Sequence, residues 1–102
     1  MISCNTHEEA TQVGDILLNK RLVACYDIFD RVSTRYFWPP QTGKIESIKG
    51  CILIGPTLHA KLDDILITVK ENHSDTTPYI GYVEMNSLNS DYTEWLHKEI
   101  KK

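Results

Sequence analysis

Two residues far apart in the sequence have side chains suited to holding a soft metal ion. Cys4 ends a short apolar segment just before a predicted helix N-terminus, where the helix dipole lowers the pKa of a thiol and favours the thiolate. His73 lies in a polar loop that leads into the last predicted strand. Together they predict a copper-type site, with His7 as a third donor. A small buried cysteine and a solvated loop histidine would show the same spacing, so both interpretations stay open.

The sequence lacks the motifs that mark catalytic nucleophiles and phosphate-binding loops. The chain has no G-x-S-x-G nucleophile motif and no glycine-rich phosphate loop, and His59 and His97 fall on the exposed sides of predicted helices. Cys4 has no second cysteine beside it in the sequence, while Cys25 and Cys51 lie in predicted strands and are expected to pack in the core. We therefore expect a protein that is not an enzyme and requires no cofactor, with copper or another divalent cation as its candidate ligand.

Aromatic residues precede a predicted turn, and charged residues follow it. Tyr36, Phe37 and Trp38 precede the turn, and Lys44 and Glu46 follow it. Aromatic side chains dominate subunit contacts, and they also line small-molecule pockets. The set Tyr36, Trp38, Lys44 and Glu46 therefore predicts either a ligand pocket or an interface, and we favour the interface.

The amino-acid composition argues against nucleic-acid binding and against a membrane-spanning segment. The 102 residues include 11 basic and 14 acidic side chains, for a formal net charge of −3, which argues against the clustered positive face that nucleic-acid binding needs. No apolar stretch approaches the roughly 20 residues that span a bilayer, and no signal peptide is expected. Three widely spaced cysteines imply no disulfide framework, so we expect a cytoplasmic protein.

Hydrophobic periodicity predicts the elements that must position these residues. Their order is β-α-β-β-α-β with an additional C-terminal helix, which is the split β-α-β sandwich of ferredoxin-like α+β folds, with an antiparallel sheet in one domain over residues 1–102. A bend is expected near Asp30, because the second strand is long, and the apolar end of the third strand predicts a central position. The open face of such a sheet needs a cover, and another copy of the chain is the simplest one. The predicted strands are 1–4, 23–38, 45–54 and 79–85, and the predicted helices start near Thr6, Thr57 and Ser90.

Four segments in order resemble the CutA family of divalent-cation tolerance proteins. Glu8-Glu9-Ala10 after Cys4 fits its start, and residues 21–25, R-L-V-A-C, match its signature after the first helix. Residues 36–46 are similar to its aromatic hairpin with G-K-I-E, and residues 91–96, D-Y-T-E-W-L, resemble its closing helix. The resemblance runs essentially from end to end.

This resemblance implies a homotrimer of ferredoxin-like subunits, comparable in architecture to the PII signalling trimers, that binds copper or other divalent cations without established catalysis. Cys4 and His73 fall on the residues proposed as copper ligands in that family. The loop beginning at His73 departs from the family pattern, reading H-S-D-T-T-P-Y where the family has H-P-Y-E-x-P-E.

Three functional hypotheses follow. The first is a trimeric cation-binding or sensing protein. The second is a PII-like regulatory or scaffold module that binds an unidentified protein partner, or a small ligand at subunit interfaces, without metal. The third is a small ferredoxin-like enzyme such as an acylphosphatase. That chemistry needs a phosphate-binding loop with an arginine and an asparagine, which the surroundings of Thr6 do not supply.

Overall fold

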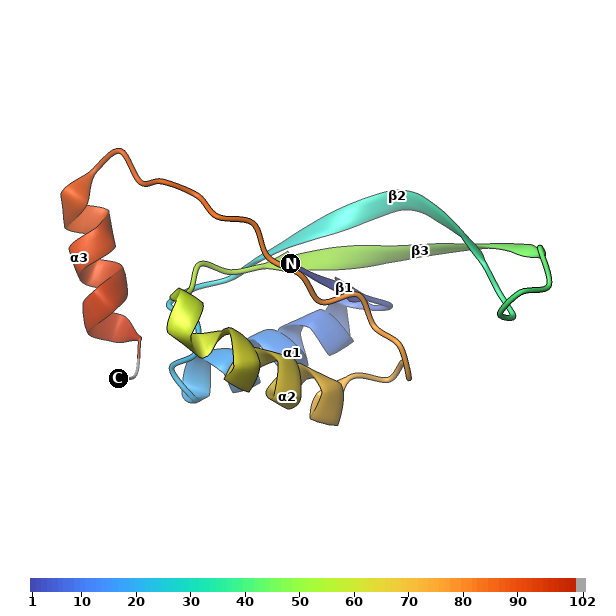
Figure 1. Ribbon diagram of the computed structural model, residues 1–102, viewed down its shortest axis with the longest axis horizontal. Coiled ribbons are helices and arrows are strands. Elements are labelled where there is room, and N and C mark those ends of the chain that lie inside the picture. Colours follow the sequence, from blue (N-terminus) through green and yellow to red (C-terminus); the bar gives the residue numbers. More distant parts are fainter. Residues whose placement is uncertain (101–102) are drawn as a thin grey trace.

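A three-stranded antiparallel sheet carries two helices on one face, and a third helix stands apart at one end (Figure 1). The computed structural model describes residues 1–100, and residues 101–102 lie outside the described part. The α+β class and the antiparallel sheet predicted from the sequence are confirmed. The elements are β1 (Ile2–Cys4), α1 (His7–Asn19), β2 (Asp27–Phe37), β3 (Ile45–Ile54), a 3-10 turn η1 (His59–Lys61), α2 (Leu62–Asn72) and α3 (Ser90–Glu99).

The central strand is β3, as its apolar second half predicted. It pairs with β1 on one side and with β2 on the other, in the order β1-β3-β2. The register between β2 and β3 shifts between Arg31 and Thr34, which confirms the expected irregularity near Asp30. Because β2 begins at Asp27, the prediction that it starts at Val23 was wrong. Arg21 closes α1 with a left-handed φ of 56°, and Val23 then packs into the core.

The predicted fourth strand, residues 79–85, is reduced to one bridge. Ile80 pairs with Ile2, supported by backbone bonds from Ser3 N–H to the Tyr79 carbonyl (3.1 Å) and from Gly81 N–H to the Met1 carbonyl (3.0 Å). The prediction of a full strand here was wrong. The residues have a β-forming composition, but β1 is only three residues long and offers no further partner. The chain beyond Ile80 therefore runs extended along the surface until α3 (Figure 1).

The predicted starts of the last two helices also need correction. Thr57 is not a helix cap, because its hydroxyl donates to the Leu22 carbonyl at 2.6 Å and α2 starts only at Leu62, after η1. Ser90 is the first residue of α3 instead of its cap, and none of the residues of α3 itself is buried. Its predicted apolar face is half exposed, with Tyr92 and Trp95 each 40% accessible.

The N-terminal turn of α1 sets the position of an acidic side chain. The Thr6 hydroxyl accepts a hydrogen bond from Glu9 N–H at 3.0 Å, which confirms the predicted cap. The Glu9 carboxylate reaches back to Asn5 N–H at 3.0 Å, one residue earlier than a standard capping box would place it. This hydrogen bond turns the carboxylate of Glu9 toward the end of β1.

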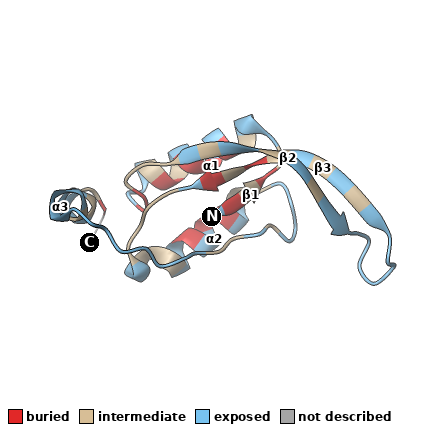
Figure 2. Ribbon diagram, turned by 90° about the horizontal axis from the view of Figure 1, so that it is seen from above, coloured by how far each residue is buried: buried red, intermediate tan, exposed pale blue. Residues whose placement is uncertain are grey.

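Buried side chains concentrate between the sheet and the two helices, where α1, α2 and β1 meet (Figure 2). On β1 and β3 they alternate, with Ile2, Cys4, Cys51 and Leu53 all facing the helices. The opposite face of the sheet is open, and Phe29 on it is 54% accessible. The open face that the sequence predicted is therefore present in the single chain.

Gly50 lets β1, β2 and β3 approach one another closely beside Cys4. A Cβ at this position would lie 2.5 Å from the Cys4 carbonyl oxygen and 2.5 Å from a guanidinium nitrogen of Arg31. Because the carbonyl belongs to the backbone, it cannot rotate away. We expect Gly50→Ala to lower the free energy of unfolding by about 1–3 kcal/mol in urea titrations. The exposed Ser47→Ala on the same strand serves as the control, and equal stabilities of the two variants would contradict the close approach.

Candidate metal centre

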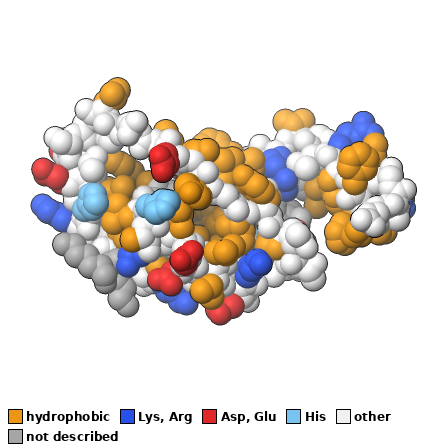
Figure 3. Space-filling model, viewed as in Figure 1, with side chains coloured by type: hydrophobic (Ala, Val, Ile, Leu, Met, Phe, Trp, Pro, Cys, Tyr) orange, Lys and Arg blue, Asp and Glu red, His pale blue; other side chains and the backbone are white. Residues whose placement is uncertain are grey.

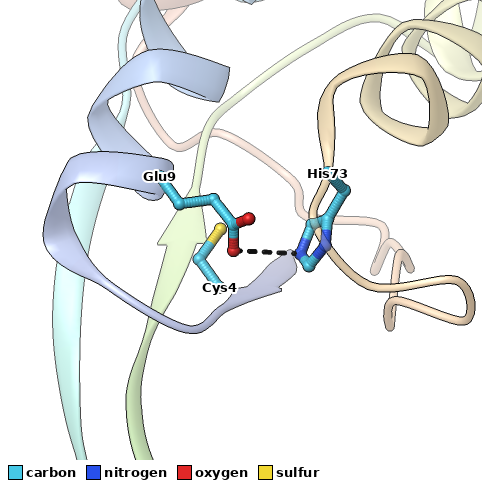
Figure 4. Close-up of side chains that lie close together, drawn as sticks. All are labelled: Cys4, Glu9 and His73. Atoms are coloured by element: carbon cyan, nitrogen blue, oxygen red, sulfur yellow. Dashed lines mark ion pairs between the residues drawn. The ribbon is translucent and has the colours of Figure 1, made fainter.

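Three side chains from distant parts of the chain converge at the end of β1 (Figure 4). Cys4 ends that strand, Glu9 lies in the first turn of α1, and His73 follows α2. One ligand atom of each lies within 4.8 Å of the other two. The structure thus brings together Cys4 and His73, the two residues predicted from the sequence, and adds Glu9.

His73 is held by hydrogen bonds on both ring nitrogens. Its side chain is fully buried, and its Nε2 lies 2.6 Å from the Ser3 carbonyl oxygen and 3.6 Å from Glu9 Oε1. Nδ1 accepts from Asp75 N–H at 3.0 Å, so in the neutral ring Nε2 carries the proton and donates to Ser3. These contacts join the loop after α2 to β1.

Burial, helped by the neighbouring Cys51 and Glu9 and opposed by the Arg31 guanidinium, raises the pKa of the Cys4 thiol to about 12. The expectation of a thiolate favoured by the helix dipole was therefore wrong. The side chain is fully buried in the core, where desolvation of the charged form outweighs the dipole. Cys4 is a protonated thiol at neutral pH, and a cation must displace that proton.

The Glu9 carboxylate, in contrast, is stabilised in its charged form. Burial alone would raise its pKa, but hydrogen bonds from Asn5 N–H (3.0 Å) and Ser74 N–H (2.9 Å), together with the nearby His73, bring the pKa below its ordinary value of 4.5. The carboxylate ties the start of α1 to the loop after α2.

This lowered pKa predicts an acid-sensitive contact. A carboxyl group with a depressed folded-state pKa stabilises the fold fully above 4.5, and this contribution is lost as the pH falls below 4.5 through the folded value. We expect Glu9→Gln to lower the free energy of unfolding by about 1–3 kcal/mol at pH 7 and to flatten its decline below that pH. Urea titrations over a pH series measure both effects. Glu8→Gln, at an exposed neighbouring position, should leave the curve of the parent unchanged.

The donor types of the cluster fit a thiophilic divalent cation. Thiolate, imidazole and carboxylate are the ligands that zinc and copper ions take in proteins. A cation bound at Nε2 would require the loss of the Cys4 proton and of both ring hydrogen bonds of His73, because the ring proton would move to Nδ1, which could then no longer accept from Asp75 N–H.

His7 is not part of the cluster. Its Nε2 contacts Asp30 Oδ1 on β2 instead, and both side chains are largely exposed. The third donor is Glu9, which was not predicted as a ligand from the sequence. The reach of its carboxylate past Thr6 to Asn5 is a three-dimensional feature that helical spacing does not reveal.

The aromatic and charged set predicted as a pocket or an interface gathers at the outer half of the hairpin. Tyr36 pairs with Glu46, and Trp38 N–H donates to the Lys44 carbonyl at 3.0 Å. Tyr36 and Trp38 line a groove of about 540 Å³ shared with residues 75–77. Lys44 Nζ and Glu46 Oε1 form an exposed ion pair of 3.2 Å and do not line that groove. In residues 1–100 no helix is long and apolar enough to cross a membrane.

The comparisons with known proteins agree with one another. The family described as CutA1 divalent ion tolerance protein matches residues 1–99. A divalent-cation tolerance protein CutA from Pyrococcus horikoshii is 33% identical over 95 residues, covering 93% of this chain and 89% of the relative. A protein CutA homolog from Danio rerio is 26% identical over 100 residues, and the alignment covers 98% of this chain but only 65% of that longer relative.

Solved structures show the same architecture. The crystal structure of CutA1 from Pyrococcus horikoshii superposes with a TM-score of 0.89 at 30% identity, covering 99% of this chain and 95% of that one. The match extends over both the sheet and the helices that position Cys4, Glu9 and His73. The chain belongs to the CutA1 family of divalent ion tolerance proteins.

Proposed function

We propose that this protein acts in divalent-cation tolerance as a non-enzymatic homotrimer whose subunits each bind a cation, copper or another thiophilic ion, at Cys4, Glu9 and His73. The observation that supports this most is the meeting of three ligand atoms within 4.8 Å from three separate elements. Relatives named divalent-cation tolerance proteins support the same role.

The chemistry of the cluster suits reversible capture of a cation. Binding releases the Cys4 proton, so the apparent affinity rises with pH. Glu9 is already charged at neutral pH and attracts the cation, while the buried His73 supplies a nitrogen donor once its proton has moved. All three cysteines are free thiols, which suits the reducing cytoplasm expected from the sequence.

Self-association is supported by apolar surface that the single chain leaves uncovered. Figure 3 shows hydrophobic side chains gathered both on the body of the molecule and on the hairpin. Two segments contribute most of them, the β2–β3 hairpin and the extended chain before α3. Accessible residues there include Phe29, Val32, Phe37, Ile45, Val83, Met85 and Leu88. Association of copies would bury this surface and supply partners for the extended backbone.

A second candidate function rests on the groove beside the hairpin. Its volume of about 540 Å³ and the rings of Tyr36 and Trp38 would suit a small ligand or the side chains of a protein partner. In this alternative the trimer is a PII-like regulatory or scaffold module, and binding needs no metal.

Equilibrium dialysis of the purified protein against Zn²⁺ or Cd²⁺ separates the two functions. The cation-binding role predicts one ion retained per chain, with affinity increasing from pH 6 to pH 8. A protein that retains no ion at any pH in this range, but forms a trimer, would contradict the cation role and favour the regulatory one.

A further inference from the structure

The sheet places a second cysteine directly opposite Cys4. In the antiparallel register of β1 and β3, Cys4 pairs with Cys51, and both side chains are completely buried on the face that carries the helices. The two residues are 47 positions apart in the sequence, so the pairing appears only in the fold. Both thiols therefore lie on the same face of the sheet, although Cys51 is not among the three side chains whose ligand atoms lie within 4.8 Å of one another.

The geometry of such a pair suits a shared metal ion. Directly opposite residues of antiparallel strands have Cβ atoms about 4.5–5.5 Å apart, with both side chains on one face. Two sulfur ligands at about 2.3 Å from a tetrahedral ion lie roughly 4 Å from each other. Side-chain rotation alone can bring sulfurs on such Cβ atoms to that separation, without movement of either strand.

The thiol of Cys51 already points to the helix that carries Glu9. Its Sγ donates to the Thr6 carbonyl at 3.4 Å, at the N-terminal cap of α1. A sulfur–hydrogen donor makes only a weak hydrogen bond, so turning Cys51 toward Cys4 gives up little.

We propose that Cys51 is a second sulfur ligand of the cation site, which makes the site a dithiol centre that selects soft, thiophilic cations such as Cd²⁺, Zn²⁺ or Cu⁺ over hard ones such as Mg²⁺. This inference rests on the proposed cation-binding function and extends it. Each thiol gives its proton to water on binding, and the two thiolates, the Glu9 carboxylate and His73 make four ligands. Around a divalent cation this set has a net charge of −1, and the Arg31 guanidinium, which donates to the Cys4 carbonyl at 3.2 Å, lies beside it. Paired thiolates favour soft metals, whereas Mg²⁺ prefers oxygen ligands.

Titration with Cd²⁺ under reducing conditions counts the sulfur ligands, because each thiolate adds to the ultraviolet sulfur-to-cadmium charge-transfer band. Per bound ion, we expect Cys51→Ala to show about half the band of the parent and to bind at least about tenfold more weakly, since even residues beyond the direct ligands change metal affinity by about 10–100-fold. Cys25→Ala is the matched control, because Cys25 contacts Tyr92 outside the cluster and its loss should leave the band intact. Mg²⁺ in large excess should not displace Cd²⁺.

Two outcomes separate this inference from the function on which it rests. A full-strength band and unchanged affinity in Cys51→Ala, with both lost in Cys4→Ala, would overturn the dithiol centre and leave a single-sulfur cation site. No band and no binding in the parent would overturn the cation function itself. Should Cys51→Ala fold poorly, ¹¹³Cd NMR of the parent decides instead, because its chemical shift distinguishes one sulfur ligand from two.

Discussion

Combined replacement of Cys4 by Ser and His73 by Ala is expected to lower cation affinity by at least about 100-fold. The two substitutions remove a sulfur and a nitrogen donor from a cluster whose ligand atoms lie within 4.8 Å of one another. Glu9 and Cys51 would remain, but two of the four proposed ligands hold thiophilic ions far more weakly than the full set. Competition with a chromophoric chelator for Zn²⁺ or Cd²⁺ measures the change.

The matched control replaces one cysteine and one histidine that lie outside the cluster. Cys25→Ser combined with His97→Ala removes a thiol and an exposed imidazole outside the cluster. This control variant should retain the affinity of the parent. A Cys4→Ser, His73→Ala protein that is folded by circular dichroism and binds the cation as tightly as the parent would show that the site lies elsewhere.

Replacing Phe37 and Ile45 by Ser is expected to dissociate the proposed trimer at micromolar concentrations. The two residues pair directly near the end of the hairpin, and they are 69% and 51% accessible in the single chain. Because neither contributes to the core, the subunit should stay folded. Loss of an interface hot spot costs about 2 kcal/mol or more, so two such losses weaken association by roughly 1,000-fold.

Sedimentation equilibrium measures this dissociation directly. The control is Lys49→Ser, an exposed polar position on the same strand, which should remain trimeric. A Phe37→Ser, Ile45→Ser variant that sediments like the parent would place the interface on other surfaces, such as the extended segment before α3.

Features encoded by neighbouring residues could be predicted from the sequence. The Thr6 cap, the extent of β3 and the bend of β2 depend on local spacing, and each is present in the fold. The absence of a full fourth strand could not be predicted from local spacing. Residues 79–85 have the composition of a strand, but a strand also needs a partner, and β1 is too short to provide one.

The candidate cation site was only partly predictable for a similar reason. Cys4 and His73 stood out by residue type, but Glu9 joins them through a hydrogen bond to Asn5 that no periodic pattern contains. The opposite position of Cys51 depends on the register between β1 and β3. The sign of the pKa change at Cys4 depends on complete burial, which a helix-terminus pattern does not report.

Native mass spectrometry of the parent protein with a slight excess of Zn²⁺ tests the central claim most directly, since it counts chains and retained ions in the same particle. The expected result is a complex of three chains holding one ion per chain, and the same complex without ions for the Cys4→Ser, His73→Ala variant. A parent protein seen as three chains that retain no zinc, or as a single chain, would contradict the claim.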